Sequence, residues 1–272
     1  MIIATHGIVA SQLSGFDSDA QAFFNRVTTA GGTLSATEKT AVNQLVLDLK
    51  SYSIWTKMKA IYPMVGASSA ACAQNLKSSS FTGTFTSGWT FASTGVTPNG
   101  TSAYMDTGLN PSLQTNWISN NHQSFYSRTQ TPSGAGWNMG VGNVSTGAPL
   151  FGLAVVRSSN TAIYDSGNFP NGRTSSLQTD ARAFWLGSCT ASNTRKLIKN
   201  GSVITTNTNT DTNAAPNNVI YVGALKDTST IGDQFMPQQC AFASIGDGLS
   251  DTEAGNFYTA VQAFQTTLSR NV

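Results

Sequence analysis

The sequence predicts a mainly β protein, an antiparallel two-sheet sandwich with a small N-terminal helical unit and a C-terminal helix. Beyond residue 66, short alternating runs rich in aromatic and β-branched residues recur between Gly, Asn, Pro or Ser. Three short amphipathic segments precede that region and a further one follows it. Charged residues make up only 10% of the chain, so hydroxyls and amides carry the polarity, as is typical of strands and turns.

The first 15 residues form a short, mostly apolar arm that lacks helical spacing. Such a segment can pair as an edge strand with its own body, or with a partner subunit by strand addition. The sequence leaves both alternatives open. In the second, the docking residues are the apolar side chains of the arm: Ile2, Ile3, Ile8, Val9 and Leu13.

Residues 16–66 change to a helical period and are predicted to form a small helical unit. Asp17 is placed to cap a first helix, which the glycine pair at 31–32 ends. Ser35 and Glu38 have the spacing of a capping box and open a second helix. The apolar faces of the two helices are Ala20, Phe23, Phe24 and Val27, and Val42, Leu45, Val46 and Leu49.

A third, shorter helical segment is predicted around Ile54, Trp55 and Met58. It must end near Pro63, because proline cannot continue a helix. Three short amphipathic segments cannot bury their apolar faces by themselves. We therefore expect this unit to pack on the β domain or on another subunit.

Residues 67–249 are predicted to form the sandwich, with about eleven strands separated by turn signals. Asn-Gly pairs at 99–100, 171–172 and 200–201 are the strongest of these signals, since both residues tolerate positive φ. The strands are expected at residues 81–85, 89–91, 103–105, 124–127, 137–139, 150–156, 162–164, 184–186, 196–198, 219–222 and 240–245.

Residues 250–272 are predicted to form a helix that packs on the sandwich. Ser250 and Glu253 have the spacing of a capping box, directly after a strand that ends in two glycines. The apolar residues that follow recur at three- and four-residue spacing, so one face of the helix must be buried. These residues are Ala254, Phe257, Tyr258, Val261, Phe264 and Leu268.

This join resembles the end of laminin-G-like, concanavalin-type jelly rolls, in which a last strand leads into a Leu-Ser-Asp-x-Glu helix start. Residues 249–253 match that start. Residues 182–187 and 195–204 resemble the paired strands of these folds with their Asn-Gly hairpin, and residues 218–223 resemble the next strand. The resemblance covers roughly residues 180–265 and implies a jelly-roll sandwich more firmly than a function.

A second pattern, in order along the chain, consists of residues 1–7, 48–63, 88–90, 97–100, 125–128 and 241–265. These segments resemble a group of bacteriophage virion proteins. The resemblance implies a structural subunit on a tail or capsid surface, with homotrimers favoured and other virion proteins as partners. Residues 74–79 depart from the pattern, since the group has Phe-Asn-Leu-Lys-Asp-Pro there. The connection from helices to sandwich is therefore expected to differ.

Composition argues against several partners and locations. The net charge is +2 with scattered Lys and Arg, which does not support binding to nucleic acid or to an anionic membrane. No stretch reaches the ~20 apolar residues of a membrane span, and the chain start lacks the pattern of a secretion signal. Cys72, Cys189 and Cys240 have no metal-ligand spacing and are expected to be free thiols. We expect a protein made in a host cytoplasm that resides in the virion.

Catalysis finds little support in the sequence. A glycoside hydrolase needs two carboxylates across the scissile bond, commonly glutamates. This chain has only two glutamates, Glu38 and Glu253, and both stand at the third helical position of a predicted capping box. His6 and His122 form no zinc pattern and are expected to have ordinary hydrogen-bonding roles. An enzyme is therefore not expected, although aspartate pairs keep a hydrolase as a remote alternative.

Ligand binding is harder to exclude, because sandwich lectins hold sugars with an aromatic platform and loop hydrogen bonds, sometimes through calcium. Most residues of these types serve the core or turns. Calcium is the one cofactor left open, with weak candidate ligands in Asp227, Asp233 and Asp247. The candidate contacts to a ligand are Trp117, Trp137, Tyr164, Asn168, Asn171 and Arg173.

Two main functional hypotheses follow from these observations. The first is a non-enzymatic virion structural protein, anchored by its N-terminal region and displaying the sandwich outward. The second is a receptor- or carbohydrate-binding module of a tail fibre or capsid surface, with a host-surface glycan as its partner. The two can hold together.

Overall fold

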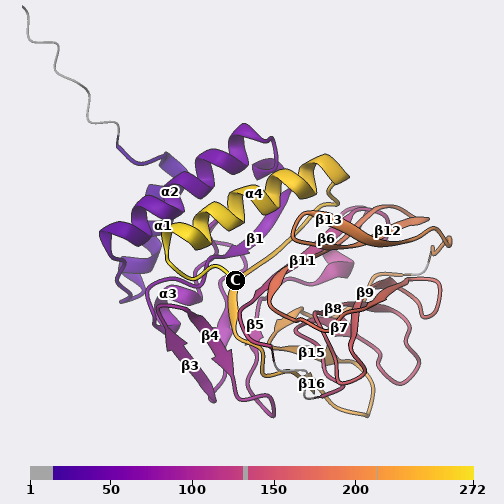
Figure 1. Ribbon diagram of the computed structural model, residues 1–272. Coiled ribbons are helices and arrows are strands. Elements are labelled where there is room, and N and C mark those ends of the chain that lie inside the picture. Colours follow the sequence, from indigo (N-terminus) through magenta and orange to yellow (C-terminus); the bar gives the residue numbers. More distant parts are fainter. Residues whose placement is uncertain (1–14, 131–133, 213) are drawn as a thin grey trace, which may run out of the picture.

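The computed structural model describes residues 15–130, 134–212 and 214–272. Two β-sheets stack face to face, and helices lie on the outer side of one of them (Figure 1). The predicted mainly β sandwich with N-terminal helices and a C-terminal helix is therefore confirmed. The apolar arm residues Ile2, Ile3, Ile8, Val9 and Leu13 lie outside the described residues, so their docking role stays a prediction.

Sheet A has eight strands, and its pairings are antiparallel. The hairpin between β12 and β13 turns at Asn200 and Gly201, which have φ of 49° and 75°, as an Asn-Gly turn requires. The strands, in spatial order, are β13 (Ser202–Asn207), β12 (Thr194–Lys199), β11 (Ala183–Ala191), β6 (Asn121–Ser127), β17 (Cys240–Gly246), β4 (Gly95–Pro98) and β3 (Trp89–Ala92), with β1 (Met58–Tyr62) also paired to β17.

Sheet B has nine strands and is antiparallel except where β15 runs parallel to β7. In spatial order its strands are β10 (Arg173–Leu177), β9 (Thr161–Gly167), β8 (Leu150–Ala154), β7 (Met139–Gly142), β14 (Tyr221–Val222), β5 (Met105–Asp106) and β2 (Thr84–Phe85). The remaining two are β15 (Ala224–Asp227) and β16 (Gln234–Phe235).

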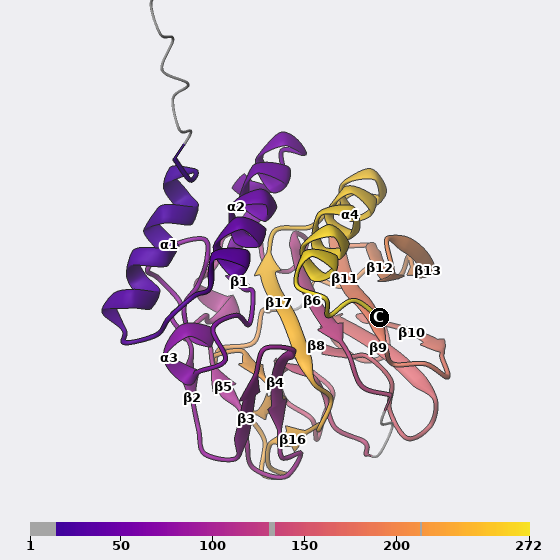
Figure 2. The ribbon, with the colours of Figure 1, turned by 60° about the vertical axis from the view of Figure 1, so that its left-hand side comes forward.

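The helices begin at the capping residues that the sequence indicates. Asp17 accepts from the Asp19 amide at the start of α1, and both predicted capping boxes form, at Ser35 with Glu38 and at Ser250 with Glu253. Figure 2 shows α2 and α4 side by side above β17 and β6. The helices are α1 (Ser18–Thr29), α2 (Ala36–Ser51), α3 (Ser69–Cys72) and α4 (Asp251–Thr267), with short 3-10 turns η1 (Trp55–Lys57) and η2 (Pro111–Leu113).

Sheet A is buried on both faces, because successive side chains of a strand point to opposite sides. On β11, Phe184 packs with the helices, while its neighbour Trp185 belongs to the core between the two sheets. On β6, Tyr126 likewise packs with the helices, while Phe125 belongs to the core between the two sheets. The protein is therefore built in three layers, with helices on sheet A and sheet A on sheet B.

Two local predictions are wrong. The third helical segment ends at Lys57, because residues 58–62 form β1 and pair with the closing strand β17. Backbone pairing in the sheet overrides the helical spacing of a short apolar run. At the second Asn-Gly pair, Gly172 does not have a positive φ, so the loop between β9 and β10 is not the expected two-residue turn.

Candidate functional site

Two loops from distant parts of the sequence meet at one end of the sandwich. The first connects β5 to β6 and begins with η2, where the Asn110 side chain accepts from the Ser112 amide. The second precedes β14 and supplies Pro216 and Asn217. The Ser112 amide donates to the Pro216 carbonyl at 3.2 Å, and the Asn110 amide group donates to Asn217 Oδ1 at 2.9 Å. These bonds hold the loops in one arrangement.

A pocket of about 450 Å³ opens between the two loops. Its polar lining consists of hydroxyl and amide side chains, and it contains no charged residue. Such a lining suits a neutral polyhydroxylated ligand, because each group can donate or accept a hydrogen bond. The lining residues are Ser112, Gln114, Asn116, Trp117, Ile118, Ser119, Ala214 and Ala215.

Trp117 is the aromatic member of this pocket. Its exposed fraction is 3%, and its ring packs edge-on against Phe151 with 4.8 Å between ring centroids. The indole Nε1 is buried and has no hydrogen-bond partner among the described residues. An unpaired buried N–H costs about 1–3 kcal/mol. A ligand can accept from this group and remove that penalty only where the pocket loop shifts to uncover it, because the atom is buried in the free protein.

Buried polar residues support the Trp117 segment from the interior. The Asn121 side chain donates to the Trp117 carbonyl and to Ser166 Oγ, and it accepts from the Tyr164 hydroxyl. Tyr164 is completely buried, and burial raises the pKa of its phenol well above the ordinary value. Its predicted role as a ligand contact is therefore wrong, since the side chain faces the core and supports the pocket loop.

Two other predicted contacts come together elsewhere, on the outer face of sheet B. Trp137 is 2% exposed and packs with Leu150, Ala154 and other apolar residues of that face. The guanidinium of Arg173 lies 5.8 Å from the Trp137 ring centroid. The indole ring of Trp137 lies beneath charged side chains and is covered by its neighbours. It is therefore not the exposed aromatic surface that we expected for a sugar.

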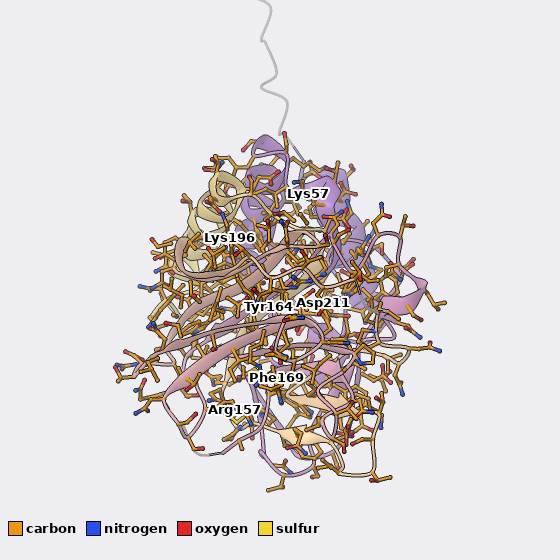
Figure 3. The ribbon with its side chains drawn as sticks, turned by 90° about the vertical axis from the view of Figure 1, so that its right-hand side faces the viewer. Lys57, Arg157, Tyr164, Phe169, Lys196 and Asp211 are labelled. Carbon is orange, nitrogen blue, oxygen red and sulfur yellow. The ribbon has the colours of Figure 1, made fainter. Side chains whose placement is uncertain are left out.

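The loop between β9 and β10 carries Asn168 and Asn171 near the pocket end of the sandwich. The Asn168 amide donates to the Asp211 carboxylate, and its buried Oδ1 has no hydrogen-bond partner among the described residues. Asn171 is exposed, and its carbonyl accepts from the Asn207 side chain at 2.9 Å. Figure 3 shows Tyr164 and Asp211 at mid-height, with Phe169 of the same loop below them. Among the described residues, no hydrogen bond joins Asn168 or Asn171 to the Trp117 pocket.

Asp227, a candidate calcium ligand, is instead bonded to its own turn. Its Oδ1 accepts from the amides of Val144 and Ser229, and its Oδ2 accepts from the Ser229 hydroxyl and the Gly232 amide. Burial raises the pKa of Asp227, but these hydrogen bonds more than offset that effect, so the pKa is lowered overall. Protein donors therefore occupy both oxygens.

The other two candidate aspartates are paired with lysines. Asp233 lies 3.5 Å from Lys226, and Asp247, in the join between β17 and α4, lies 3.0 Å from Lys59. Within residues 15–130, 134–212 and 214–272, no group of three or more His, Cys, Asp or Glu side chains is placed to hold a metal ion. The same ranges contain no helix long and apolar enough to cross a membrane.

Sequence reasoning found one pocket residue, Trp117, and missed the others. The hydroxyl and amide side chains of residues 112–119 resemble those of any surface loop. Ala214 and Ala215 come from a segment about a hundred residues away, between the strands predicted at residues 196–198 and 219–222. The Asn110-Pro-Ser start of η2 is the available signal, since it indicates an ordered turn just before the tryptophan.

Known structures share the fold at low sequence identity. Domain 4 of AbnA, an extracellular arabinanase from Geobacillus stearothermophilus solved in complex with arabinotriose, matches with a TM-score of 0.54 and 13% identity, over 74% of this chain and 98% of that domain. Trypanosoma rangeli sialidase in complex with sialic acid matches with a TM-score of 0.55 and 10% identity, over 79% of this chain.

The chain spans only 38% of the sialidase's length, so that likeness concerns one part of a longer enzyme. No protein-family model matches the chain. No curated protein matches it either. At these identities the comparisons show the fold alone, a jelly-roll-like β-sandwich found in proteins solved with carbohydrate ligands.

Proposed function

We propose that this protein is a carbohydrate-binding module and that its sugar site is the pocket beside Trp117. The observation that carries the proposal is the combination of one tryptophan with hydroxyl and amide side chains in a pocket of about 450 Å³. Sugars present apolar C–H faces and many hydroxyls, so they bind through aromatic rings and neutral hydrogen-bonding groups. The pocket size falls within the range of about 300–1,000 Å³ typical of small-ligand sites.

The fold comparison supports the scaffold of this proposal. The arabinanase domain that shares the sandwich was solved with a trisaccharide bound. Proteins that share a fold need not bind the same ligand, so the proposal for this chain rests on its own pocket. We further propose that binding occurs without catalysis, because Glu38 and Glu253 both hold helix starts.

The setting we propose is the surface of a virion, with the N-terminal region as anchor, homotrimers as the favoured state and a host-surface glycan as the partner. The resemblance of several segments to bacteriophage virion proteins supports it. Deleting residues 1–14 should abolish incorporation of the protein into particles. Electron microscopy of particles carrying a labelled protein would place it on the tail or the capsid, and normal incorporation of the deletion variant would refute the anchoring role.

The sugar site is tested by removing one N–H group. Trp117→Phe keeps a ring against Phe151 but removes the unpaired indole donor, so affinity for any glycan identified on an array should fall by about tenfold, the worth of one hydrogen bond of roughly 1.4 kcal/mol. Trp89→Phe is the matched control, since Trp89 Nε1 is also buried and without a partner but lies outside the pocket.

Four further results bear on this proposal. Asn116→Ala should weaken binding as well, because Asn116 lines the pocket and is exposed. Equal affinities of the Trp117 and Trp89 variants would show that the sugar binds elsewhere. An array with no binding at all, with and without calcium, would refute the module itself, and release of reducing sugar from a bound glycan would overturn the non-catalytic role.

A further inference from the structure

Two arginines converge on the outer face of sheet B, above the covered ring of Trp137. Arg157 follows β8, and its guanidinium carbon lies 5.4 Å from the Trp137 ring centroid. Arg173 opens β10 and lies 5.8 Å from the same centroid. Figure 3 labels Arg157 and Phe169 in the lower half of the view, on this side of the molecule. We call Arg157 and Arg173, with Asp165 and Phe169, the arginine cluster.

The arginine cluster has more positive than negative charge. Arg173 is directly opposite Asp165 across the β9–β10 pair, and its Nε and Nη2 donate to both carboxylate oxygens at 2.6–3.1 Å. That carboxylate is 2% exposed and is already satisfied by Arg173. Among the described residues, the side chain of Arg157 has one hydrogen bond, from Nη2 to the Ala135 carbonyl. Two cations therefore share one anion.

The positive charge of Arg157 is only partly balanced by its neighbours. Burial and the nearby charge of Arg173 both lower the pKa of its guanidinium. Its Nε and Nη1 have no hydrogen-bond partner among the described residues. A guanidinium binds a carboxylate or a sulfate with two parallel hydrogen bonds, and such charge-assisted bonds are about twice as strong as neutral ones. The vacant donors and excess charge together favour an anionic ligand.

Phe169 adds an apolar surface beside these charges. It is 53% exposed, at the tip of the loop between β9 and β10, and the Arg173 guanidinium lies 4.6 Å from its ring centroid. The Phe169 amide donates to the Gly147 carbonyl at 2.8 Å, which fixes the loop tip against the β7–β8 connection. A fixed, exposed ring next to a cation can hold the C–H face of a charged sugar.

We propose that the arginine cluster is a second glycan site, selective for saccharides that carry a carboxylate or sulfate group, with Arg157 binding the anion and Phe169 contacting the sugar ring. The inference rests on the proposed function only in taking the ligand to be a saccharide. It concerns a different face and different residues from the Trp117 pocket, so each site can fail without the other.

The test compares three polymers with one backbone: dextran, carboxymethyl-dextran and dextran sulfate, each immobilised for biolayer interferometry at low and physiological salt. We expect binding to one or both charged polymers, weakening as salt increases, and at least tenfold weaker binding to neutral dextran. The two charged polymers distinguish a carboxylate ligand from a sulfate ligand. Equal binding to all three polymers, or to none, overturns the proposal.

Arg157→Gln identifies the site, and Arg182→Gln is its matched control. Arg182 is exposed and paired to Asp180 at 3.0 Å outside the cluster, so both variants lose one positive charge. We expect Arg157→Gln to weaken binding to the charged polymer by about tenfold and Arg182→Gln by less than twofold. Equal losses would indicate nonspecific attraction and refute the site. Arg173 is left intact, because its removal would leave buried Asp165 unpaired.

Two additional variants separate the inference from the proposed function. Phe169→Ala should weaken binding to the charged dextrans without changing the melting temperature, since its ring is half exposed. Trp117→Phe should leave unchanged the salt-dependent excess of binding to the charged dextrans over neutral dextran. If Trp117→Phe abolishes glycan binding on the array while Arg157→Gln has no effect on charged polymers, the pocket stands and the arginine cluster is refuted.

Discussion

His122 is a buried histidine that the fold requires to be neutral. Its Nδ1 donates to the Asp247 carbonyl at 2.6 Å and its Nε2 accepts from the Ser244 hydroxyl at 3.0 Å, which together use both ring nitrogens of one neutral tautomer. Burial lowers its pKa from 6.5 to about 4, and the charges of Lys57 and Lys59 act in the same direction. The expected hydrogen-bonding role is what this geometry provides.

The low pKa of His122 makes the stability of the protein depend on pH. Between pH 6.5 and about 4 the unfolded chain binds a proton at this residue and the folded chain does not, so stability falls as pH falls through that window. The loss should reach about 3 kcal/mol at pH 4, at 1.4 kcal/mol per unit. Urea unfolding at pH 7, 5.5 and 4 measures it.

His122→Gln should flatten this pH dependence while lowering stability at neutral pH. Carboxyl groups with a lowered pKa, such as Asp17 and Asp227, stabilise the folded protein until they are protonated. Their contribution to stability is therefore lost at a lower pH than the titration range of His122. A wild-type slope that persists unchanged in the variant would assign the pH dependence to other groups. An NMR titration of the His122 ring gives the pKa independently.

At the scale of elements, Glu253 stabilises the join between β17 and α4. Glu253 Oε2 accepts from the Ser250 amide at 2.8 Å, and Oε1 lies 2.6 Å from Lys57 Nζ. Burial raises the pKa of Glu253, but the bonds from Lys57 and Ser250 more than offset it and leave it lowered. The helix cap therefore also ties α4 to η1.

Glu253→Ala should lower the free energy of unfolding by about 1–2 kcal/mol, since it removes both the capping box and the ion pair. Glu253→Gln can still accept from the Ser250 amide, so it should cost less than about 1 kcal/mol, the range of a partly exposed pair. Chemical denaturation of both variants at pH 7 measures the difference. Equal costs would show that the ion pair, rather than the cap, holds the join.

Local signals predicted the helices well and the strands unevenly. Capping boxes are contained within four residues, so Ser35 and Ser250 marked the helix starts correctly. β10 was missed, because its Ser and Thr side chains alternate little in hydropathy and its pairing partner decides the structure. β1 was mistaken for helix for the same reason, since only pairing with β17, far along the chain, selects the strand.

At the scale of the whole molecule, the two proposed binding sites could not be predicted because the topology assembles them. The Trp117 pocket joins a loop before β6 to one before β14, and the arginine cluster joins residues after β8 to residues of β9 and β10. The aromatic residues were visible in the sequence. Which of them would be covered depended on the sheet order, which placed Tyr164 between the sheets and Trp137 beneath two arginines.

The shared sheet A also predicts how the molecule unfolds. Because its two faces belong to the helical core and to the sandwich core, loss of either core exposes the other face of the same strands. We therefore expect a single cooperative transition. Leu45→Ala in α2, where Leu45 is 1% exposed, should cost about 2–5 kcal/mol and lower the melting temperature by roughly 5–10 °C.

Two spectroscopic measurements should report the same shift in melting temperature. Far-UV circular dichroism follows the helices, and near-UV circular dichroism follows tryptophans such as Trp185, which is completely buried between the sheets. Leu47→Ala is the matched control on the same helix, since Leu47 is 42% exposed and should change the melting temperature little. If Leu45→Ala lowers only the far-UV midpoint, the helical layer unfolds independently and sheet A does not couple the two cores.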